Sequence, residues 1–159
     1  MYSSPFFTFH FSFFIFNWFP LPSPQKTHIL NSGMENKALV KSRKFAIRIY
    51  KLYRYLCDIK REYVLAKQLL RSGTSIGANL TEAQYAVSKK EFLVKVTISL
   101  KEAAETEYWL DLLKETNILT QSEHESMAKD CKELLRLLIS TIKTIRQRIK
   151  NSEQRTKKK

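Results

Sequence analysis

The chain has 159 residues, enough for one domain with a hydrophobic core, and its 43% hydrophobic and 27% charged residues are ordinary for a globular protein. The formal net charge of +13 is unusual and favours contact with phosphate-rich or acidic surfaces. Two cysteines, Cys57 and Cys131, exclude a disulfide framework and have no metal-ligand spacing.

Residues 1–33 differ in composition from the rest of the chain. Eight of the ten phenylalanines lie between Phe6 and Phe19, and Lys26 is the only charged residue of this segment. The apolar run is shorter than the roughly 20 residues of a membrane-spanning helix and lacks the basic start of a secretory signal. An atypical targeting segment, a membrane-associating tail and a gene-start artefact are the alternatives. We favour the artefact, with translation starting at Met34.

The first helix is predicted over residues 37–57, because apolar residues recur there at helical spacing. The apolar stripe consists of Phe45, Ile49, Leu52 and Leu56. The opposite face is basic and carries Lys41, Lys44, Arg48, Lys51 and Arg54. Residues 58–61 form a short polar connection.

The second helix is predicted over residues 63–87 and contains the segment QLLRSGTSIGANLTEA. One face of this segment carries Leu69, Ile76, Leu80 and Ala83. Glycine in a helix interior costs about 1 kcal/mol relative to alanine, so Gly73 and Gly77 indicate close approach of another backbone. We expect that neighbour to be the small residues Ser99 and Ala103 of the third helix.

The third helix is predicted from the N-cap Ser88, which forms a capping box with Glu91, to about Thr116. Its buried stripe is predicted to be Phe92, Val96, Ser99, Ala103, Thr106, Leu110 and Leu113. Asn117 ends this helix.

The fourth helix is predicted over residues 121–150, after a second capping box formed by Thr120 and Glu123. Its buried residues are predicted to be Met127, Cys131, Leu134, Leu138, Ile142, Ile145 and Ile149. Residues 151–159 have no apolar side chain, and we expect them to be disordered. Long helices with short connections predict an all-α, up-down-up-down antiparallel four-helix bundle over residues 34–150.

Residues that carry chemistry form no catalytic constellation in this sequence. His124 stands between Glu123 and Glu125, but adjacent helical residues do not face each other, so we expect a surface histidine. The cysteines lie beside leucines and are expected to be buried and inert. Glu-x-x-His pairs, a phosphate-binding glycine loop and a Ser-His-Asp set are all missing from the sequence. We therefore expect no enzymatic activity, cofactor, metal or small-molecule substrate.

Polar residues of the second and third helices are expected to meet in a buried or interfacial network. The predicted members are Arg71, Ser75, Asn79, Glu82 and a third-helix glutamate, with Glu102 and Glu105 on a shared face. Such groups are costly unless mutually satisfied, so a role in fixing register or an interface is favoured over catalysis.

The aromatic residues with polar atoms are typical of a core edge or an oligomer interface, and base stacking is the alternative. They are Tyr50, Tyr53, Tyr55, Tyr63, Tyr85, Tyr108 and Trp109. Basic residues near the C-terminus form either a phosphate-binding arm or a solvated helix end. They are Lys143, Arg146, Arg148, Lys150, Arg155, Lys157, Lys158 and Lys159.

Two segments, KQLLRSGTSIGANLTEA and SKKEFLVKVTISLKEAAETEYWLDLL, resemble the bacterial family named after intervening sequences of 23S ribosomal RNA genes. The family pattern falls on Arg71, Ser72, Ser75, Ile76, Asn79 and Glu82, followed by Lys90, Glu91 and Phe92; Ala83 replaces a frequent glycine. The resemblance implies a homo-oligomeric four-helix bundle, with pentameric rings among its members. The family is similar to the accessory protein of diversity-generating retroelements, a basic barrel that engages RNA and reverse transcriptase. No enzymatic activity is implied.

These observations favour a cytoplasmic homo-oligomer, with a pentamer among the expected assemblies, that binds RNA or another nucleic acid with low sequence specificity. The predicted phosphate contacts are Lys44, Arg48, Lys51, Arg54, Arg146 and Lys150. The alternative is a protein–protein adaptor with an acidic partner protein and no nucleic-acid ligand. Neither alternative involves a membrane.

Overall fold

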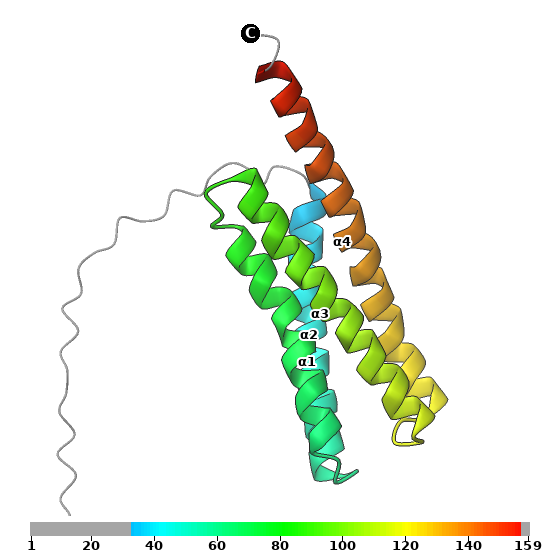
Figure 1. Ribbon diagram of the computed structural model, residues 1–159. Coiled ribbons are helices and arrows are strands. Elements are labelled where there is room, and N and C mark those ends of the chain that lie inside the picture. The colour runs from blue at the N-terminus through cyan, green and yellow to red at the C-terminus, as the bar shows by residue number, and fades with distance from the viewer. Residues whose placement is uncertain (1–32, 157–159) are drawn as a thin grey trace, which may run out of the picture.

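The computed structural model describes residues 33–156; residues 1–32, which hold nearly all of the Phe-rich segment, and 157–159 lie outside the described part. Its elements are the helices α1 (Gly33–Asp58), α2 (Val64–Ala83), α3 (Lys89–Glu115) and α4 (Gln121–Thr156). Consecutive helices run side by side in opposite directions (Figure 1), and α4 also packs against α1. The prediction of an all-α four-helix bundle is confirmed, with no strand in residues 33–156. None of the described helices is long and apolar enough to cross a bilayer.

The hydrophobic core lies along the centre of the bundle and follows the predicted apolar stripes. In α3 the buried residues are the predicted ones, from Phe92 to Leu113, including the small or polar Ser99, Ala103 and Thr106. The largest fully buried side chains come from all four helices: Phe45, Ile49, Leu56, Leu69, Ile76, Leu110, Leu113, Leu134, Leu138 and Ile145. The amphipathic period therefore predicted most of the buried residues, although Leu52 and Ile149 of the predicted stripes are only half-buried.

The glycines of α2 face α1, so the predicted pairing with Ser99 and Ala103 is wrong. A Cβ added to Gly73 would lie 2.8 Å from Cγ1 of Ile49, and one added to Gly77 would lie 3.3 Å from Oγ of Ser42. The physical reason is that α2 lies between two neighbours. Its glycines point towards α1, and other positions of the same helix point towards α3.

Small residues of α3 still permit close contacts with both of its neighbours. The Ser99 hydroxyl donates a hydrogen bond to the Ile76 carbonyl oxygen of α2 at 3.0 Å. On the other side, the Cys131 thiol of α4 donates to the Ala103 carbonyl oxygen at 3.3 Å. At Ser99 the α3 side chain therefore reaches the backbone of α2, and at Ala103 the side chain of α4 reaches the backbone of α3.

Helix α2 ends at Ala83, whereas the sequence predicts that it continues to Val87. The next amides, of Gln84, Tyr85 and Ala86, bond to carbonyls three residues back, which tightens and ends the helix. Ser88 has extended backbone angles (φ −146°, ψ 157°), as an N-cap requires, and its side chain accepts from the Glu91 amide. The α2–α3 turn thus spans residues 84–88 and ends at the N-cap of α3.

The turn between α3 and α4 follows the predicted signals. Asn117 has a left-handed backbone (φ 59°), a conformation that asparagine tolerates better than most residues. The Thr120 amide donates to Glu123 Oε2 at 2.8 Å, and the Glu123 amide donates back to the Thr120 hydroxyl at 3.3 Å. This reciprocal pair is the predicted capping box.

Helix α4 continues to Thr156, so the prediction of disorder after Lys150 is wrong for residues 151–156. These residues include good helix formers such as Gln and Arg and no glycine or proline, so nothing in them ends the helix. Lys90 of α3 also pairs with Glu153 at 3.5 Å, which ties the extended end to the bundle. The last turns of α4 project beyond the other helices (Figure 1).

Candidate nucleic-acid interface

The basic residues of α1 that face α4 are neutralised by acidic residues of that helix. Lys41 pairs with Glu133 at 2.6 Å, and Arg48 forms an ion pair with Asp130. The Arg48 guanidinium also donates to the Ser126 hydroxyl at 2.7 Å. Arg48, a predicted phosphate contact, is therefore occupied in holding α1 against α4.

The other predicted contacts on α1 divide into one paired residue and two unpaired ones. Arg54 pairs with Asp58 at 2.9 Å, one helical turn further on. Lys44 and Lys51 are exposed, and neither forms an ion pair with a described residue. Lys44 and Lys51 are thus the predicted α1 residues with the charge most open to solvent.

The predicted contacts on α4, Arg146 and Lys150, are also exposed. The ion pairs of Lys41 and Arg48 place the middle of α1 beside the first half of α4. Since α1 and α4 are antiparallel, Lys44 lies near the middle of the bundle, Lys51 lies towards one end, and Arg146 and Lys150 lie towards the other. The structure does not bring the predicted phosphate contacts into one cluster.

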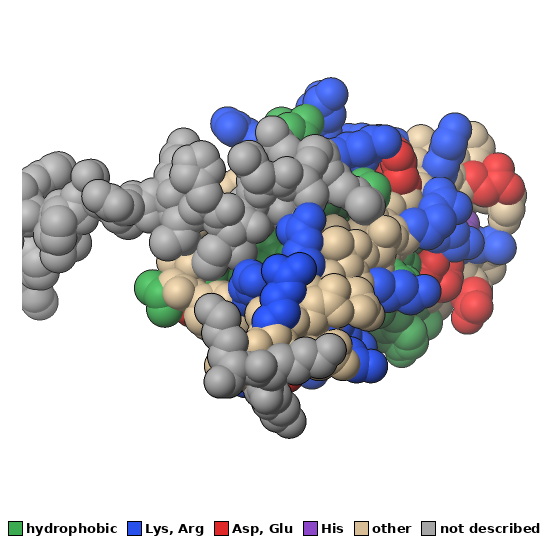
Figure 2. Space-filling view, turned by 90° about the horizontal axis from the view of Figure 1, so that it is seen from above, with side chains coloured by type: hydrophobic (Ala, Val, Ile, Leu, Met, Phe, Trp, Pro, Cys, Tyr) green, Lys and Arg blue, Asp and Glu red, His purple; other side chains and the backbone are tan. Residues whose placement is uncertain are grey.

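Further cations lie on α4 that the sequence reasoning missed. Lys129, Lys132 and Arg136 are exposed and precede Lys143 at helical spacing. The signal was available, because intervals of three or four residues place side chains on one helix face. Viewed along the bundle (Figure 2), lysine and arginine side chains are spread around the surface, whereas acidic ones gather towards one side.

A shallow hollow lies where the start of α3 meets the last turns of α4. It is lined by Lys89, Arg148, Asn151, Ser152 and Arg155. Arg148 and Arg155 belong to the basic C-terminal residues identified from the sequence, and the fold adds Lys89 from another helix. The end of α4 is therefore basic on more than one side.

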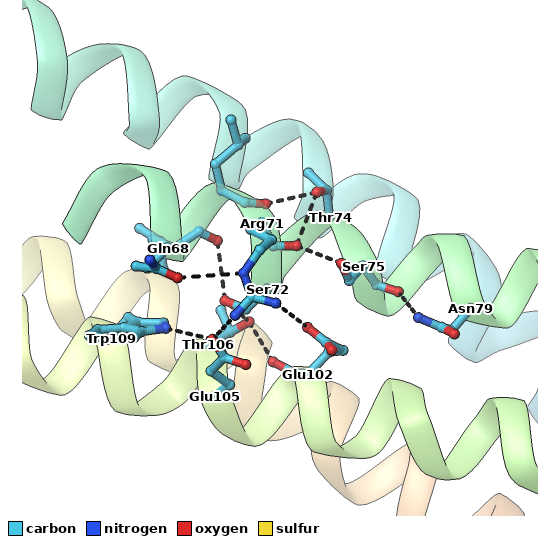
Figure 3. A network of polar contacts seen from close by, with 12 residues as sticks. Gln68, Arg71, Ser72, Thr74, Ser75, Asn79, Glu102, Glu105, Thr106 and Trp109 are labelled. Carbon is cyan, nitrogen blue, oxygen red and sulfur yellow. Dashed lines mark hydrogen bonds and ion pairs between the residues drawn. The ribbon is translucent and has the colours of Figure 1, made fainter. Parts of the chain in front are cut away.

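The predicted polar network between α2 and α3 is centred on Arg71 (Figure 3). Its guanidinium forms an ion pair with Glu105 and lies 3.9 Å from Oε2 of Glu102. The Trp109 ring nitrogen donates to the same Glu105 oxygen at 3.1 Å. One arginine thus faces two carboxylates, and the arginine side chain itself remains 56% exposed.

Beneath this ion pair lies a buried pair of hydroxyls. The Thr106 hydroxyl lies 3.0 Å from the Ser72 hydroxyl and 2.7 Å from the Glu102 carbonyl oxygen. Both side chains are fully buried. This contact joins α2 to α3 inside the core, where alternative registers would leave a polar group unpaired.

The remaining predicted network residues make different contacts. The Ser75 hydroxyl donates to the Arg71 carbonyl oxygen at 2.7 Å, and the side-chain amide of Asn79 donates to the Ser75 carbonyl oxygen at 2.9 Å. These bonds stay within α2. Glu82 pairs with Lys95 of α3 rather than with another network member.

His124 is buried, with 8% of its surface exposed, so the prediction of a surface histidine is wrong. Its Nε2 lies 2.7 Å from a carboxylate oxygen of Asp111, and its Nδ1 is buried without a hydrogen-bond partner. The physical reason is register, because position 124 precedes Met127 and Cys131 on the buried face of α4. The described residues contain no group of His, Cys, Asp and Glu that could hold a metal ion.

Both cysteines are buried and free, as the sequence predicts. Burial raises the pKa of the Cys131 thiol to about 12. A buried thiol with so high a pKa is a packing residue rather than a nucleophile.

Comparisons with known proteins agree with this architecture. No protein with a curated function matches the chain. A crystal structure of a protein of unknown function from the S23 ribosomal protein family of Bacteroides thetaiotaomicron is similar, with 50% identity and a TM-score of 0.68. The match covers 69% of this chain and 98% of that one. The family described as 23S rRNA-intervening sequence protein matches residues 34–140. This chain belongs to the 23S rRNA-intervening sequence protein family.

Proposed function

We propose that this protein is a non-enzymatic, homo-oligomeric bundle of the cytoplasm that binds RNA with low sequence specificity. The observation that carries the proposal is the net charge of +13 together with the exposure of unpaired cations. A protein with such a surface attracts the phosphate backbone and gains free energy from counterion release. An intervening sequence of 23S rRNA, from which the family takes its name, is consistent with an RNA ligand.

Low sequence specificity follows from the chemistry of the candidate contacts. Arg146 and Lys150 are exposed on the outside of a helix, and a base has no groove there in which to fit. Contacts from such side chains reach phosphates, which position a nucleic acid without reading its bases. We therefore expect affinity that falls steeply with salt and varies little with sequence.

Homo-oligomer formation is supported by the outer face of α1. Val40, Ile47 and Tyr50 share that face and are 50%, 53% and 51% exposed. Apolar side chains at helical spacing on a surface otherwise made of charges are typical of a contact with another protein. We propose that a second copy covers them, with a pentamer as the expected assembly.

The absence of enzymatic activity is part of the proposal. The cysteines and the histidine of the described residues are buried in the core, where a substrate does not reach them. Asp58, Glu82 and Glu105 are paired with cations. These arrangements stabilise a scaffold and offer no activated nucleophile.

The test is a sizing column with light scattering on the full chain, with the ratio of absorbance at 260 and 280 nm measured before and after nuclease treatment. We expect a mass that is a multiple of 18.7 kDa and bound RNA that ribonuclease removes. A protein free of nucleic acid that also fails to bind added RNA at about 50 mM salt contradicts the RNA-binding proposal. A monomer contradicts the homo-oligomer.

The exposed apolar residues of α1 also support a second candidate, a protein–protein adaptor without a nucleic-acid ligand. In that case an acidic partner protein would cover α1 and bind its lysines. The same column distinguishes the two functions, because an adaptor retains its partner protein and its absorbance ratio after nuclease.

A further inference from the structure

The outer face of α4 carries a continuous line of positive charge. The basic stripe consists of Lys129, Lys132, Arg136, Lys143, Arg146 and Lys150. Successive members are three or four residues apart, except where Ile139 occupies the position between Arg136 and Lys143. All of these side chains are exposed, and none forms an ion pair with a residue that the structure describes.

The acidic residues of the same span are paired with cations of α1, although Glu133, whose pKa is lowered first of all by Lys41, also lies close enough to Arg136 for that cation to contribute. Between positions 126 and 150 they are Asp130 and Glu133. Both pair across to α1, with Arg48 and Lys41 respectively. The α1–α4 contact therefore neutralises the two carboxylates of this span of α4 together with two cations of α1. The cations of the basic stripe keep their charge, since none of them takes part in these two ion pairs.

The dimensions of the basic stripe suit an extended polyanion. At 1.5 Å rise per residue, the distance from Lys129 to Lys150 along the helix is about 31 Å. One cation per helical turn along a straight line gives a row of point charges, whereas a compact anion would need cations that converge on one point. A nucleic-acid backbone carries its charges in such a row.

Other anionic partners fit this face less well. A helix that lies on a membrane buries large apolar side chains next to its basic ones, and the stripe contains Ile139 alone. The centre of a protein interface is depleted in lysine and enriched in aromatic residues, and no aromatic residue occurs between Lys129 and Lys150. Of the exposed large apolar residues in the described part of the chain, Ile139 is the one that lies on α4, and the others lie on the remaining helices and their connections.

We infer that the basic stripe of α4 is the surface that holds the phosphate backbone of RNA, and that α1 contributes little to it. This inference rests on the proposed RNA-binding function and assigns its site. The basic stripe contacts phosphates rather than bases, so RNA of any sequence binds along α4 and dissociates readily at high salt.

Two full-length variants with equal loss of charge test the inference. The stripe variant replaces lysines of α4: Lys129→Gln, Lys132→Gln, Lys143→Gln and Lys150→Gln. The control variant replaces exposed lysines elsewhere on the bundle: Lys37→Gln, Lys60→Gln, Lys67→Gln and Lys101→Gln. Glutamine and lysine have similar helix propensity, so both variants should fold, which circular dichroism and the melting temperature verify.

The measurement is the dissociation constant of a fluorescent single-stranded RNA of mixed sequence between about 50 and 200 mM salt. At about 200 mM salt we expect the stripe variant to bind at least about tenfold more weakly than the wild type. The slope of log K against log salt concentration should become shallower by about 2.8, which is about 0.7 for each of the four lost phosphate contacts. The control variant should keep its slope and stay within about threefold of the wild type, because it loses only long-range attraction.

Equal weakening of both variants overturns the assignment to α4 and leaves RNA binding intact as a property of net charge. No binding by the wild type overturns the proposed function as well. A competition measurement completes the test: poly-glutamate, at equal charge concentration, is compared with unlabelled RNA as a competitor of the fluorescent RNA. If it competes as well as unlabelled RNA, the stripe is a general anion surface and the assignment to RNA is wrong; weak competition supports it.

Discussion

Ile49 of α1 occupies the space next to Gly73 that a side chain at position 73 would need. A Cβ at position 73 would lie 2.8 Å from Cγ1 and 2.9 Å from Cγ2 of Ile49, closer than real carbon contacts. Ile49 is fully buried and held by the surrounding core. The branched side chain therefore packs directly on the α2 backbone, which explains why α2 tolerates a glycine in its interior.

Alanine at position 73 should destabilise the protein, and alanine at position 77 should not. Gly73→Ala gains about 1 kcal/mol of helix propensity but overpacks the Ile49 contact, for a net loss of about 1–2 kcal/mol. At position 77 the nearest atom is the Ser42 hydroxyl oxygen at 3.3 Å, which needs only a small shift. Gly77→Ala should stay within about 1 kcal/mol of the wild type. Urea unfolding of both variants measures the difference.

A double-mutant cycle tests whether Ile49 is the cause. Ile49→Ala alone should cost about 2–5 kcal/mol through the cavity it leaves. When Ile49→Ala is combined with Gly73→Ala, the methyl group added at position 73 fills part of that cavity. The double variant should therefore lose about 1–2 kcal/mol less stability than the sum of the losses of the two single variants. Strict additivity would show that Gly73→Ala acts through something other than this contact.

The buried faces of the helices could be predicted from sequence because each depends on one helix only. The period of apolar residues defines a direction around the helix axis, and in α3 every predicted position is buried. The neighbour of Gly73 depends on how three helices pack, and the period of α2 contains no information about that. The predicted contact with Ser99 was wrong for this reason.

In the candidate site, too, features that depend on one helix could be predicted from sequence, and contacts between helices could not. The pairing of Arg48 with Asp130 joins residues far apart in sequence, so no local pattern could show that Arg48 is neutralised. The basic stripe, by contrast, is a pattern within α4 and follows from spacing alone. His124 was also within reach, because its spacing from Cys131 is helical. The charged residues on either side of His124 point in other directions, because adjacent helical residues do not share a face.

Removal of the Thr106 hydroxyl should destabilise the contact between α2 and α3. Thr106→Val keeps the volume but removes the bond to Ser72, whose hydroxyl keeps only a long contact, 3.4 Å, with the Leu69 carbonyl. We expect a loss of about 1–2 kcal/mol in the free energy of unfolding, with an unchanged dependence on urea.

The matched control replaces both hydroxyls. Thr106→Val with Ser72→Ala leaves no unpaired polar group, so the double variant should lose less than the sum of the single changes. A double variant as unstable as that sum would mean that the hydroxyls act independently.

The Cys131 thiol should resist labelling as long as the protein is folded. Its pKa is raised to about 12, first of all by burial, and the thiolate is the reactive form. In a Cys57→Ala background, labelling at pH 8 should be at least about a thousandfold slower than that of a thiol with an ordinary pKa. Addition of urea should accelerate it in parallel with unfolding. Fast labelling in the absence of urea would place Cys131 outside the core.

The capping box at the start of α4 should make stability depend on pH. Hydrogen bonds from the Thr120 amide and hydroxyl lower the pKa of Glu123 below its usual value. A carboxyl with a lowered pKa in the folded state contributes stability above its unfolded pKa, about 4.3, and this contribution is lost as pH falls through the folded value. Glu123→Gln should therefore be less stable than the wild type at pH 7, by about 0.5–1 kcal/mol.

The difference between the wild type and Glu123→Gln should shrink below about pH 4 and vanish once the wild-type carboxyl is protonated. Glu125→Gln is the control, since it removes a nearby charge and leaves the Thr120 contacts in place. At pH 7 we expect the stability of Glu125→Gln to differ less from that of the wild type than the stability of Glu123→Gln does. Thermal unfolding between pH 3 and pH 7 measures all three proteins. An offset for Glu123→Gln that stays constant over this range would show that the ionised carboxylate does not cap α4.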